Sequence, residues 1–172
     1  MPTSEVDTQT TALDGVPPGT TPEVAFRVAS FAELDARTLH DLLRLRCDVF
    51  VVEQACAYPD IDGRDVEPGT RHLWLAQAGN PVAYLRILDE PSGEARIGRV
   101  VVAAHARGHG YGDRLMSEAL ALIGDRPCVL TAQAYVADFY TRYGFVATGP
   151  EFDEDGIAHV PMRRVPDVMP YG

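Results

Sequence analysis

The residues of this 172-residue chain whose types and spacing could do chemistry lie in the segment 99–116, RVVVAAHARGHGYGDRLM. A β-branched run ends there, a short connection follows, and the glycine-rich stretch Arg107–Gly112 leads into apolar residues at helical spacing. Small residues let successive backbone N–H groups point into one concavity, and a helix start adds the positive end of its dipole. The pattern therefore predicts a cradle for an anion, placed between a strand and a helix.

Two familiar anion cradles do not fit this segment. A dinucleotide-binding loop needs GxGxxG inside a parallel βαβ unit, whereas GHGYGD has another spacing and follows a predicted run of antiparallel strands. A P-loop needs a GK[ST] sequence, and this chain has no lysine, because all 15 of its basic residues are arginine. The same absence excludes a Schiff base to lysine and a Ser–Lys nucleophile.

The stretch Arg107–Gly112 matches the pattern [RQ]-x-x-G-x-[GA], which resembles the pyrophosphate loop of the GNAT N-acyltransferases. Roughly 30 residues further on, Asp138–Phe145 (DFYTRYGF) resembles the second signature of that superfamily, a tyrosine four residues before Gly-Phe. The flanking sequences, among them LRLRCDVFVVEQACAYPDIDGRD and DEDGIAHVPM, are similar to the ElaA-like acetyltransferases within the superfamily. The resemblance covers residues 25–165.

The resemblance implies that acetyl-CoA is the co-substrate. It also implies that the strand ending at Val100–Val102 splays away from the strand 129–133, which leaves backbone groups free to pair with pantetheine amides. The N–H group of Val102 would then polarise the thioester carbonyl, and Tyr140 would protonate the departing thiolate. The residues expected to bind acetyl-CoA are Val100, Val101, Val102, Arg107, Gly108, His109, Gly110, Tyr111, Gly112 and Gln133.

Direct attack by an amine requires the amine to be neutral, and its pKa is about 10, so a general base or a chain of water molecules is expected. Glu53 is the first candidate, because it matches the VEQ segment of the ElaA-like branch. His72 is the second, because a histidine needs no large pKa shift for this role. Structural roles stay open for each residue: Tyr140 in an aromatic cluster with Phe139, Glu53 at a helix end, and His72 at a strand start.

Acidic residues exceed basic ones by 25 to 15, which gives a formal net charge of −10. Such a charge repels phosphate backbones and argues against nucleic acid as a partner. Two acidic clusters, Asp60–Glu67 and Glu151–Asp155, are solvated faces in the simplest interpretation. The sharper hypothesis is that one or both border the acceptor cleft and attract a cationic amine of a small molecule or peptide.

The three cysteines show no CxxC spacing, which argues against a disulfide framework or a zinc site and favours a reducing cytoplasm. No apolar run approaches the ~20 residues that a membrane span needs, and the acidic N-terminus does not resemble a secretory signal. We therefore expect a cytoplasmic protein without a metal ion or a membrane partner. Assembly into a homodimer stays open.

The elements that position these residues follow one another in a mixed order. Along the chain we expect strand 23–30, helix 31–51, strands 72–78, 81–90 and 96–103, helix 110–123, strand 128–133, short helix 136–142, and strands 145–152 and 158–164. The first helix should start at a capping box, Ser30 with Glu33. Residues 1–22 should be a disordered tail and residues 23–168 a single domain.

This order indicates an α+β (mixed α/β) fold built on one mostly antiparallel sheet. The GNAT resemblance specifies six to seven strands, flanking helices and a splayed central pair. The predicted function is direct transfer of an acetyl group from acetyl-CoA to a primary amine in a ternary complex. Two alternatives stay open: a transferase of a longer acyl group, since VFVVEQ also resembles acyl-homoserine-lactone synthases, and a non-catalytic module that binds or senses acyl-CoA.

Overall fold

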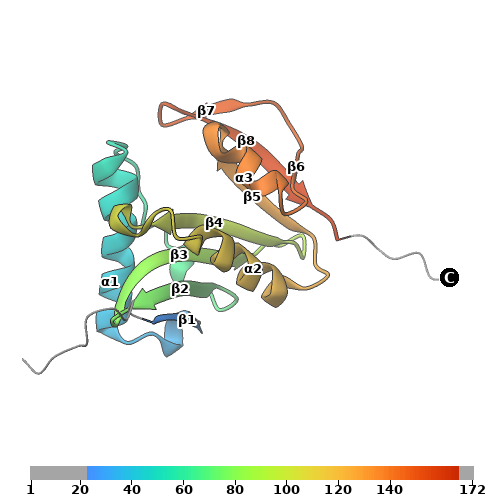
Figure 1. The fold of residues 1–172 in the computed structure, drawn as a ribbon. Helices are drawn as coiled ribbons and strands as arrows, with labels where there is room; N and C mark the ends of the chain where they lie inside the picture. Colours follow the sequence, from blue (N-terminus) through green and yellow to red (C-terminus); the bar gives the residue numbers. More distant parts are fainter. Residues whose placement is uncertain (1–22, 167–172) are drawn as a thin grey trace, which may run out of the picture.

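Eight β-strands form one sheet in the computed structural model, which describes residues 23–166 (Figure 1). Their order is β1-β2-β3-β4-β5-β8-β6, and β7 pairs with β8 outside this path. All neighbours are antiparallel except β4 and β5. The strands are β1 (Val24–Ala29), β2 (Arg71–Gln77), β3 (Asn80–Asp89), β4 (Ala95–Val102), β5 (Cys128–Gln133), β6 (Val146–Ala147), β7 (Phe152–Glu154) and β8 (Ile157–Arg164).

The predicted α+β class with a mostly antiparallel sheet is confirmed, with eight strands in place of six or seven. The extra strand arises because the predicted strand 145–152 is two short strands, β6 and β7, which pair with opposite ends of β8. Pro150 lies between them and has no N–H group for a ladder hydrogen bond. The expected tail 1–22 and residues 167–168 of the expected domain lie outside the described residues.

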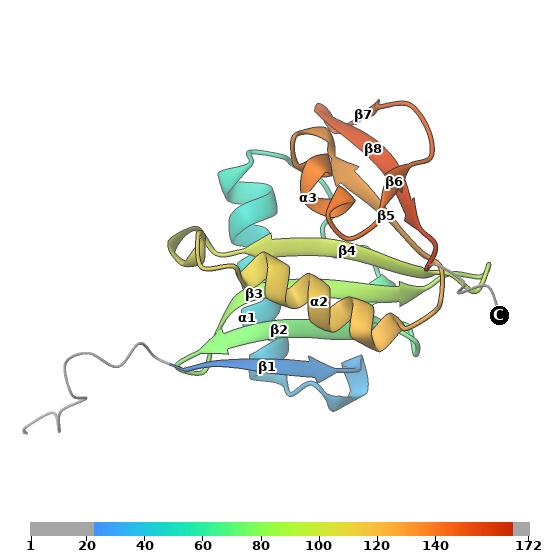
Figure 2. The ribbon, with the colours of Figure 1, turned by 45° about the vertical axis from the view of Figure 1, so that its right-hand side comes forward.

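Helices cover both faces of β2, β3 and β4 (Figure 2). In that view α2 (Tyr111–Ile123) crosses the front of these strands, and α1 (Ala36–Arg46) lies behind them. Each helix buries an apolar stripe against the sheet, with Leu115 and Met116 from α2 and Leu42 from α1. The short helix α3 (Ala137–Thr141) follows β5. Within residues 23–166 no helix is long and apolar enough to cross a membrane.

The predicted helix 31–51 is wrong in its start and in its form. Ser30 and Glu33 do form the capping box, but it closes only a single 3₁₀ turn. The α-helix begins after a second cap, Asp35, which accepts the N–H group of Thr38 at 2.8 Å. Past α1 the chain continues as a π-helix, Cys47–Glu53, a rare form that is frequent at functional sites.

The predicted splay between β4 and β5 is confirmed. The two strands pair only at Ala95 with Cys128 and Arg96 with Val129, and diverge beyond these positions. On its other side β4 stays paired with β3, with a bulge at 99–100 that shifts the register. The edge of β4 that faces β5 is therefore unpaired along most of its length.

Candidate active site

A cleft of about 910 Å³ opens where β4 and β5 diverge. Its walls come from β4, from β5 and β8, from the starts of α2 and α3, and from the π-helix with the loop after it. The volume lies in the range of small-molecule sites. The expected site residues that line it are Val100, Val101, Val102, Arg107, Gly112, Gln133, Glu53 and Tyr140. One cavity thus contains Arg107 and Gly112 at the two ends of the glycine-rich stretch, Tyr140 of the second signature and the first candidate base. The expected site residues that are not among its lining residues are Gly108, His109, Gly110 and Tyr111.

The loop between β4 and α2 leaves several N–H donors free. Gly108 and Gly110 have φ values of +80° and +73°, where glycine alone avoids strain. No hydrogen bond of the described chain is donated by the N–H groups of residues 108–110, and the first turn of α2 has no intrahelical acceptors. His109 steadies the loop, because its Nδ1 lies 3.0 Å from the carbonyl oxygen of Arg107. These donors suit a diphosphate such as that of CoA.

The N–H group of Val102 points toward the cleft. The next N–H group, that of Ala103, donates to the carbonyl oxygen of Val82 on the β3 side at 2.8 Å. Successive N–H groups of an extended strand point to opposite edges, so that of Val102 faces the unpaired edge. On the same edge, the carbonyl oxygen of Val102 accepts a hydrogen bond from Nε of Arg107 at 3.2 Å. A substrate carbonyl placed in the cleft can therefore meet a free backbone donor.

The surroundings of Tyr140 are compatible with both roles that its sequence position left open. Its ring packs edge-on against Phe139 and Phe145, at centroid distances of 5.1 and 6.3 Å. Burial, with a smaller contribution from Tyr135, raises its pKa to about 12, and no hydrogen bond contributes to this shift. The phenol is therefore protonated at neutral pH. A packed ring with an unshared hydroxyl at the cleft can act as a proton donor.

Glu53 and Arg107, which the sequence assigned to different roles, form an ion pair. Nη1 of Arg107 lies 2.7 Å from Oε1 of Glu53, and Nη2 lies 3.0 Å from Oε2. Both side chains are nearly half exposed, 46% for Arg107 and 42% for Glu53. The hydrogen bonds from Arg107 hold the pKa of Glu53 below its ordinary value. In this pairing the carboxylate is a weaker base than an unpaired glutamate.

The residue after Glu53 contacts the other arm of the cleft. Oε1 of Gln54 accepts Nε2 of Gln133, the last residue of β5, at 3.0 Å. The end of the π-helix thus contacts the loop after β4, through Arg107, and the end of β5, through Gln133. The sequence did not predict this π-helix. The spacing of the apolar residues does not distinguish a π-helix from an α-helix.

His72, the second candidate base, is excluded by its surroundings. The residue is 1% exposed and does not line the cleft. Its Nδ1 lies 2.7 Å from the hydroxyl of Tyr84, and its Nε2 lies 3.0 Å from the carbonyl oxygen of Asp65. Because a carbonyl can only accept, Nε2 carries the proton and Nδ1 accepts. Burial lowers its pKa, and both ring nitrogens are occupied.

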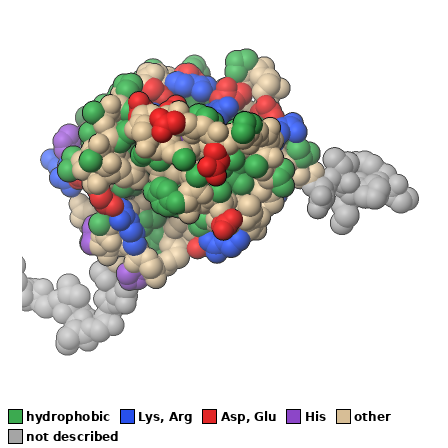
Figure 3. Space-filling model, turned by 90° about the horizontal axis from the view of Figure 1, so that it is seen from above, with side chains coloured by type: hydrophobic (Ala, Val, Ile, Leu, Met, Phe, Trp, Pro, Cys, Tyr) green, Lys and Arg blue, Asp and Glu red, His purple; other side chains and the backbone are tan. Residues whose placement is uncertain are grey.

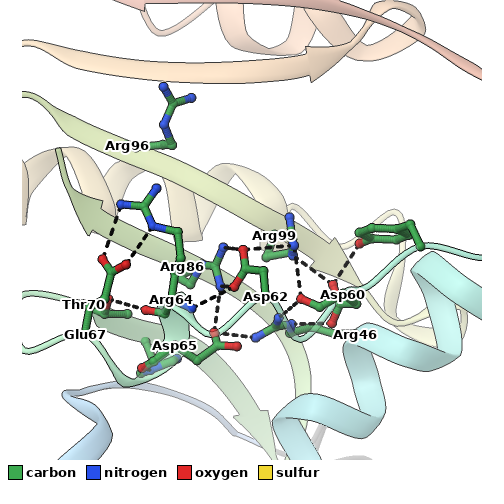
Figure 4. A network of polar contacts seen from close by, with 12 residues as sticks. Arg46, Asp60, Asp62, Arg64, Asp65, Glu67, Thr70, Arg86, Arg96 and Arg99 are labelled. Carbon is green, nitrogen blue, oxygen red and sulfur yellow. Dashed lines mark hydrogen bonds and ion pairs between the residues drawn. The ribbon is translucent and has the colours of Figure 1, made fainter. Parts of the chain in front are cut away.

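The first acidic cluster is part of a buried ionic network rather than a free border of the cleft (Figure 4). Arg46 contacts Asp60 at 2.9 Å and Asp65 at 2.7 Å, and Arg86 contacts Asp62 at 2.7 Å and Asp65 at 3.0 Å. Burial alone would raise the pKa of Asp65, yet the hydrogen bonds from the arginines hold it low. Arginine therefore neutralises these carboxylates.

This network fixes the loop 54–70, part of which lines the cleft. The hypothesis that Asp60–Glu67 attracts a cationic amine is therefore not supported, because its carboxylates, including that of Asp62 at the cleft, are paired with arginines. The sequence carried one unused signal of the network: Arg46 and Arg86 stand inside the apolar runs LLRLRC and AYLRIL. Arginines in such runs must find buried acidic partners.

The second acidic cluster keeps its proposed place. Residues 151–155 are exposed, and Glu154 and Asp155 line the cleft. Neither takes part in an ion pair within the described residues. The face seen in Figure 3 carries separate acidic side chains among hydrophobic and arginine side chains, with no broad acidic patch. Any attraction of an amine by this cluster is therefore local to the cleft.

Comparison with known proteins agrees with this geometry. The family model described as "Acetyltransferase (GNAT) domain" matches residues 45–165. A UPF0039 protein of Mycobacterium tuberculosis is 51% identical over 136 residues, which cover 77% of this chain and 87% of the relative.

Two solved structures are similar over most of the chain. The crystal structure of an acyl-CoA N-acyltransferase from Pseudomonas aeruginosa has a TM-score of 0.79 and 42% identity, and covers 83% of this chain and all of that one. The crystal structure of Escherichia coli ElaA has a TM-score of 0.78 and 38% identity, with 83% and 99% covered. The resemblance to the superfamily and to its ElaA-like branch is confirmed.

Proposed function

We propose that this chain, which belongs to the GNAT acetyltransferase family, moves an acetyl group from acetyl-CoA to a primary amine of a small molecule or peptide. The observation that carries the proposal is the cleft whose lining includes both ends of the glycine-rich stretch, Arg107 and Gly112, together with the unpaired edge of β4 and Tyr140. The relative from Pseudomonas aeruginosa, an acyl-CoA N-acyltransferase, supports transfer from an acyl-CoA to nitrogen.

In the proposed reaction both substrates are bound when the amine nitrogen attacks the thioester carbon. The N–H group of Val102 donates to the carbonyl oxygen as negative charge develops there. Glu53 accepts the proton that the nitrogen loses, directly or through water. The carbon–sulfur bond then breaks, and Tyr140 gives its proton to the thiolate. The products are the N-acetylated amine and CoA, and solvent returns the proton from Glu53 to Tyr140.

The loop after β4 provides the binding energy for CoA in this proposal. The free N–H groups of residues 108–112 and the Arg107 guanidinium would hold the diphosphate. Pantetheine would pair with the open edge of β4 at Val100–Val102 and with the end of β5 at Gln133. The three cysteines form no disulfide, which supports the proposal that the protein works in a reducing cytoplasm.

CoA binding and turnover together test the proposal. Isothermal titration should show CoA binding, and thiol release in the presence of polyamines, aminoglycosides, amino acids or peptides should identify the acceptor. Gly110→Val should abolish CoA binding, because valine is strained at a φ of +73°. Gly79→Val, at a φ of +80° in the turn before β3, is the matched control and should bind CoA normally. CoA binding without thiol release for any amine would favour the non-catalytic module.

A further inference from the structure

Arg107 holds two partners of different kinds. Its Nε donates to the main-chain carbonyl of Val102 at the end of β4, whereas its two Nη groups hold the side chain of Glu53 on the π-helix. The first contact fixes the guanidinium beside the cleft. The second can be exchanged without any movement of the strand, because it joins only two side-chain ends.

The Glu53 contact is the weaker competitor for this guanidinium. Both side chains are nearly half exposed, and exposed ion pairs add little free energy. A diphosphate carries more charge than a carboxylate, and arginine binds phosphate oxygens in the same two-pronged manner. The free N–H groups of residues 108–110, directly after Arg107, would hold such a group next to it.

We propose that the diphosphate of acyl-CoA replaces Glu53 on Arg107, so that the Glu53 carboxylate is released to the acceptor only when the donor is bound. This inference rests on the proposed function and adds a link between its two sites. Without acyl-CoA, the arginine occupies the carboxylate that the amine needs. With acyl-CoA, the carboxylate is free to accept a proton from the amine. The Gln54–Gln133 contact keeps the end of the π-helix in place during the exchange.

A double-mutant cycle on CoA affinity tests the exchange without measuring turnover. Glu53→Gln removes the competing charge, so CoA should bind about two- to fivefold more tightly, as expected for an exposed ion pair. In the Arg107→Gln background the same substitution should change the affinity little, because no guanidinium remains to compete for. Glu154→Gln is the matched control, since Glu154 lines the same cleft without an ion pair to Arg107.

The outcomes separate this inference from the proposed function. Absence of CoA binding by the wild-type protein would contradict the proposed function itself. If CoA binds but Glu53→Gln has equal effects in both backgrounds, or none in the wild type, the exchange does not occur. If Glu154→Gln increased the CoA affinity as much as Glu53→Gln does, the effect would come from the net charge of the cleft and not from the ion pair. That result would also overturn the inference.

The carboxylate can be followed directly by ¹³C NMR, with its signal assigned by its loss in Glu53→Gln. Apart from Arg107, the charged or titratable groups that share a pocket with Glu53 include Asp41, Arg44 and Asp48 of the same helical segment and His105 after β4 on one side, and Tyr135, Glu154 and Asp155 in the cleft on the other. None of them changes partner in the proposed exchange. Saturation with CoA should therefore raise the pKa of Glu53 toward that of an unpaired glutamate. An unchanged pKa at saturation would show that the ion pair persists and would overturn the inference.

Discussion

Nε of Arg99 lies 2.8 Å from Oδ1 of Asp60, and this ion pair joins the bulge of β4 to the loop after the π-helix. A second guanidinium nitrogen of Arg99 donates to the main-chain carbonyl of Asp60 at 3.1 Å. Arg99 adopts a φ of 55°, a value that residues other than glycine rarely adopt. The strand whose edge is unpaired at the cleft and the loop that lines the cleft opposite it are thus held as one unit.

Substitutions of Arg99 should separate the strain at this bulge from the ion pair. Arg99→Ala should lower the free energy of unfolding by about 1–3 kcal/mol, because buried Asp60 loses a partner. Arg99→Gly loses the same contacts but relieves the positive φ, so it should be more stable than the alanine variant by about 1 kcal/mol. Urea unfolding measures both. If the alanine variant were as stable as the glycine variant, the positive φ at residue 99 would not strain the chain.

Tyr140→Phe should reduce kcat by about 10²–10⁴-fold if the phenol protonates the thiolate, since general acids contribute in that range. The ring packing remains and the hydroxyl shares no hydrogen bond, so CoA affinity and the unfolding midpoint should change little. Thiol release and titration with CoA measure the two effects. Tyr135→Phe, another tyrosine of the cleft wall, is the control. Unchanged turnover in Tyr140→Phe would remove the residue from the reaction.

Local patterns predicted the elements around the glycine-rich stretch well. A glycine-rich stretch between a strand and a helix is a short-range signal, and so is the apolar spacing that gives α2. The splay of β4 from β5 followed from the GNAT resemblance and is confirmed by pairing that stops at Arg96 and Val129. The glycine-rich stretch and α2 depend on residues close together in the sequence, where chain geometry leaves few options, whereas the splay joins distant strands and needed the resemblance.

The contacts of the π-helix and of the loop 54–70 could not be predicted, because they join residues that are far apart in the sequence. Glu53 and Arg107 are 54 positions apart, and Arg46 reaches Asp65 across 19. A charge count cannot tell a paired aspartate from a free one, so the sequence left Asp60–Glu67 as either a solvated face or a border of the cleft. His72 was considered as a base because the sequence does not show its burial, which depends on strand pairing with Arg86 in β3 and on the contact with the Tyr84 hydroxyl.

Stability should fall on mild acidification because of His72. Burial holds its folded-state pKa below the 6.5 of the unfolded chain, so its neutral form stabilises the fold fully above pH 6.5. That contribution is lost as the pH falls toward the folded-state pKa, with a slope of up to about 1.4 kcal/mol per pH unit. Asp62 and Asp65, whose pKa values are lowered, lose their contribution only below about pH 4.

Urea unfolding between pH 8 and pH 5 measures this contribution. His72→Gln should be less stable than the wild type at pH 8, because its amide replaces the ring imperfectly, but its stability should depend less on pH between 6.5 and 5. His40→Gln is the control, since His40 is exposed on α1 with 69% of its side chain accessible. An unchanged slope in His72→Gln would show that another group titrates in this range.

Salt dependence should reveal whether Glu154 and Asp155 attract the amine. Both are exposed on the wall of the cleft, so their field acts through water and is screened over about 10 Å at 0.1 M salt. With a cationic acceptor, its KM should rise steeply between 0.02 and about 0.5 M salt, while the KM for acetyl-CoA changes less. In Glu154→Gln/Asp155→Asn the acceptor KM should be higher at low salt and nearly independent of salt. Asp62 is already paired with Arg86, so the loop network should not supply this dependence. A flat response in the wild type would exclude the cluster from acceptor recognition and leave the shape of the cleft as the source of specificity.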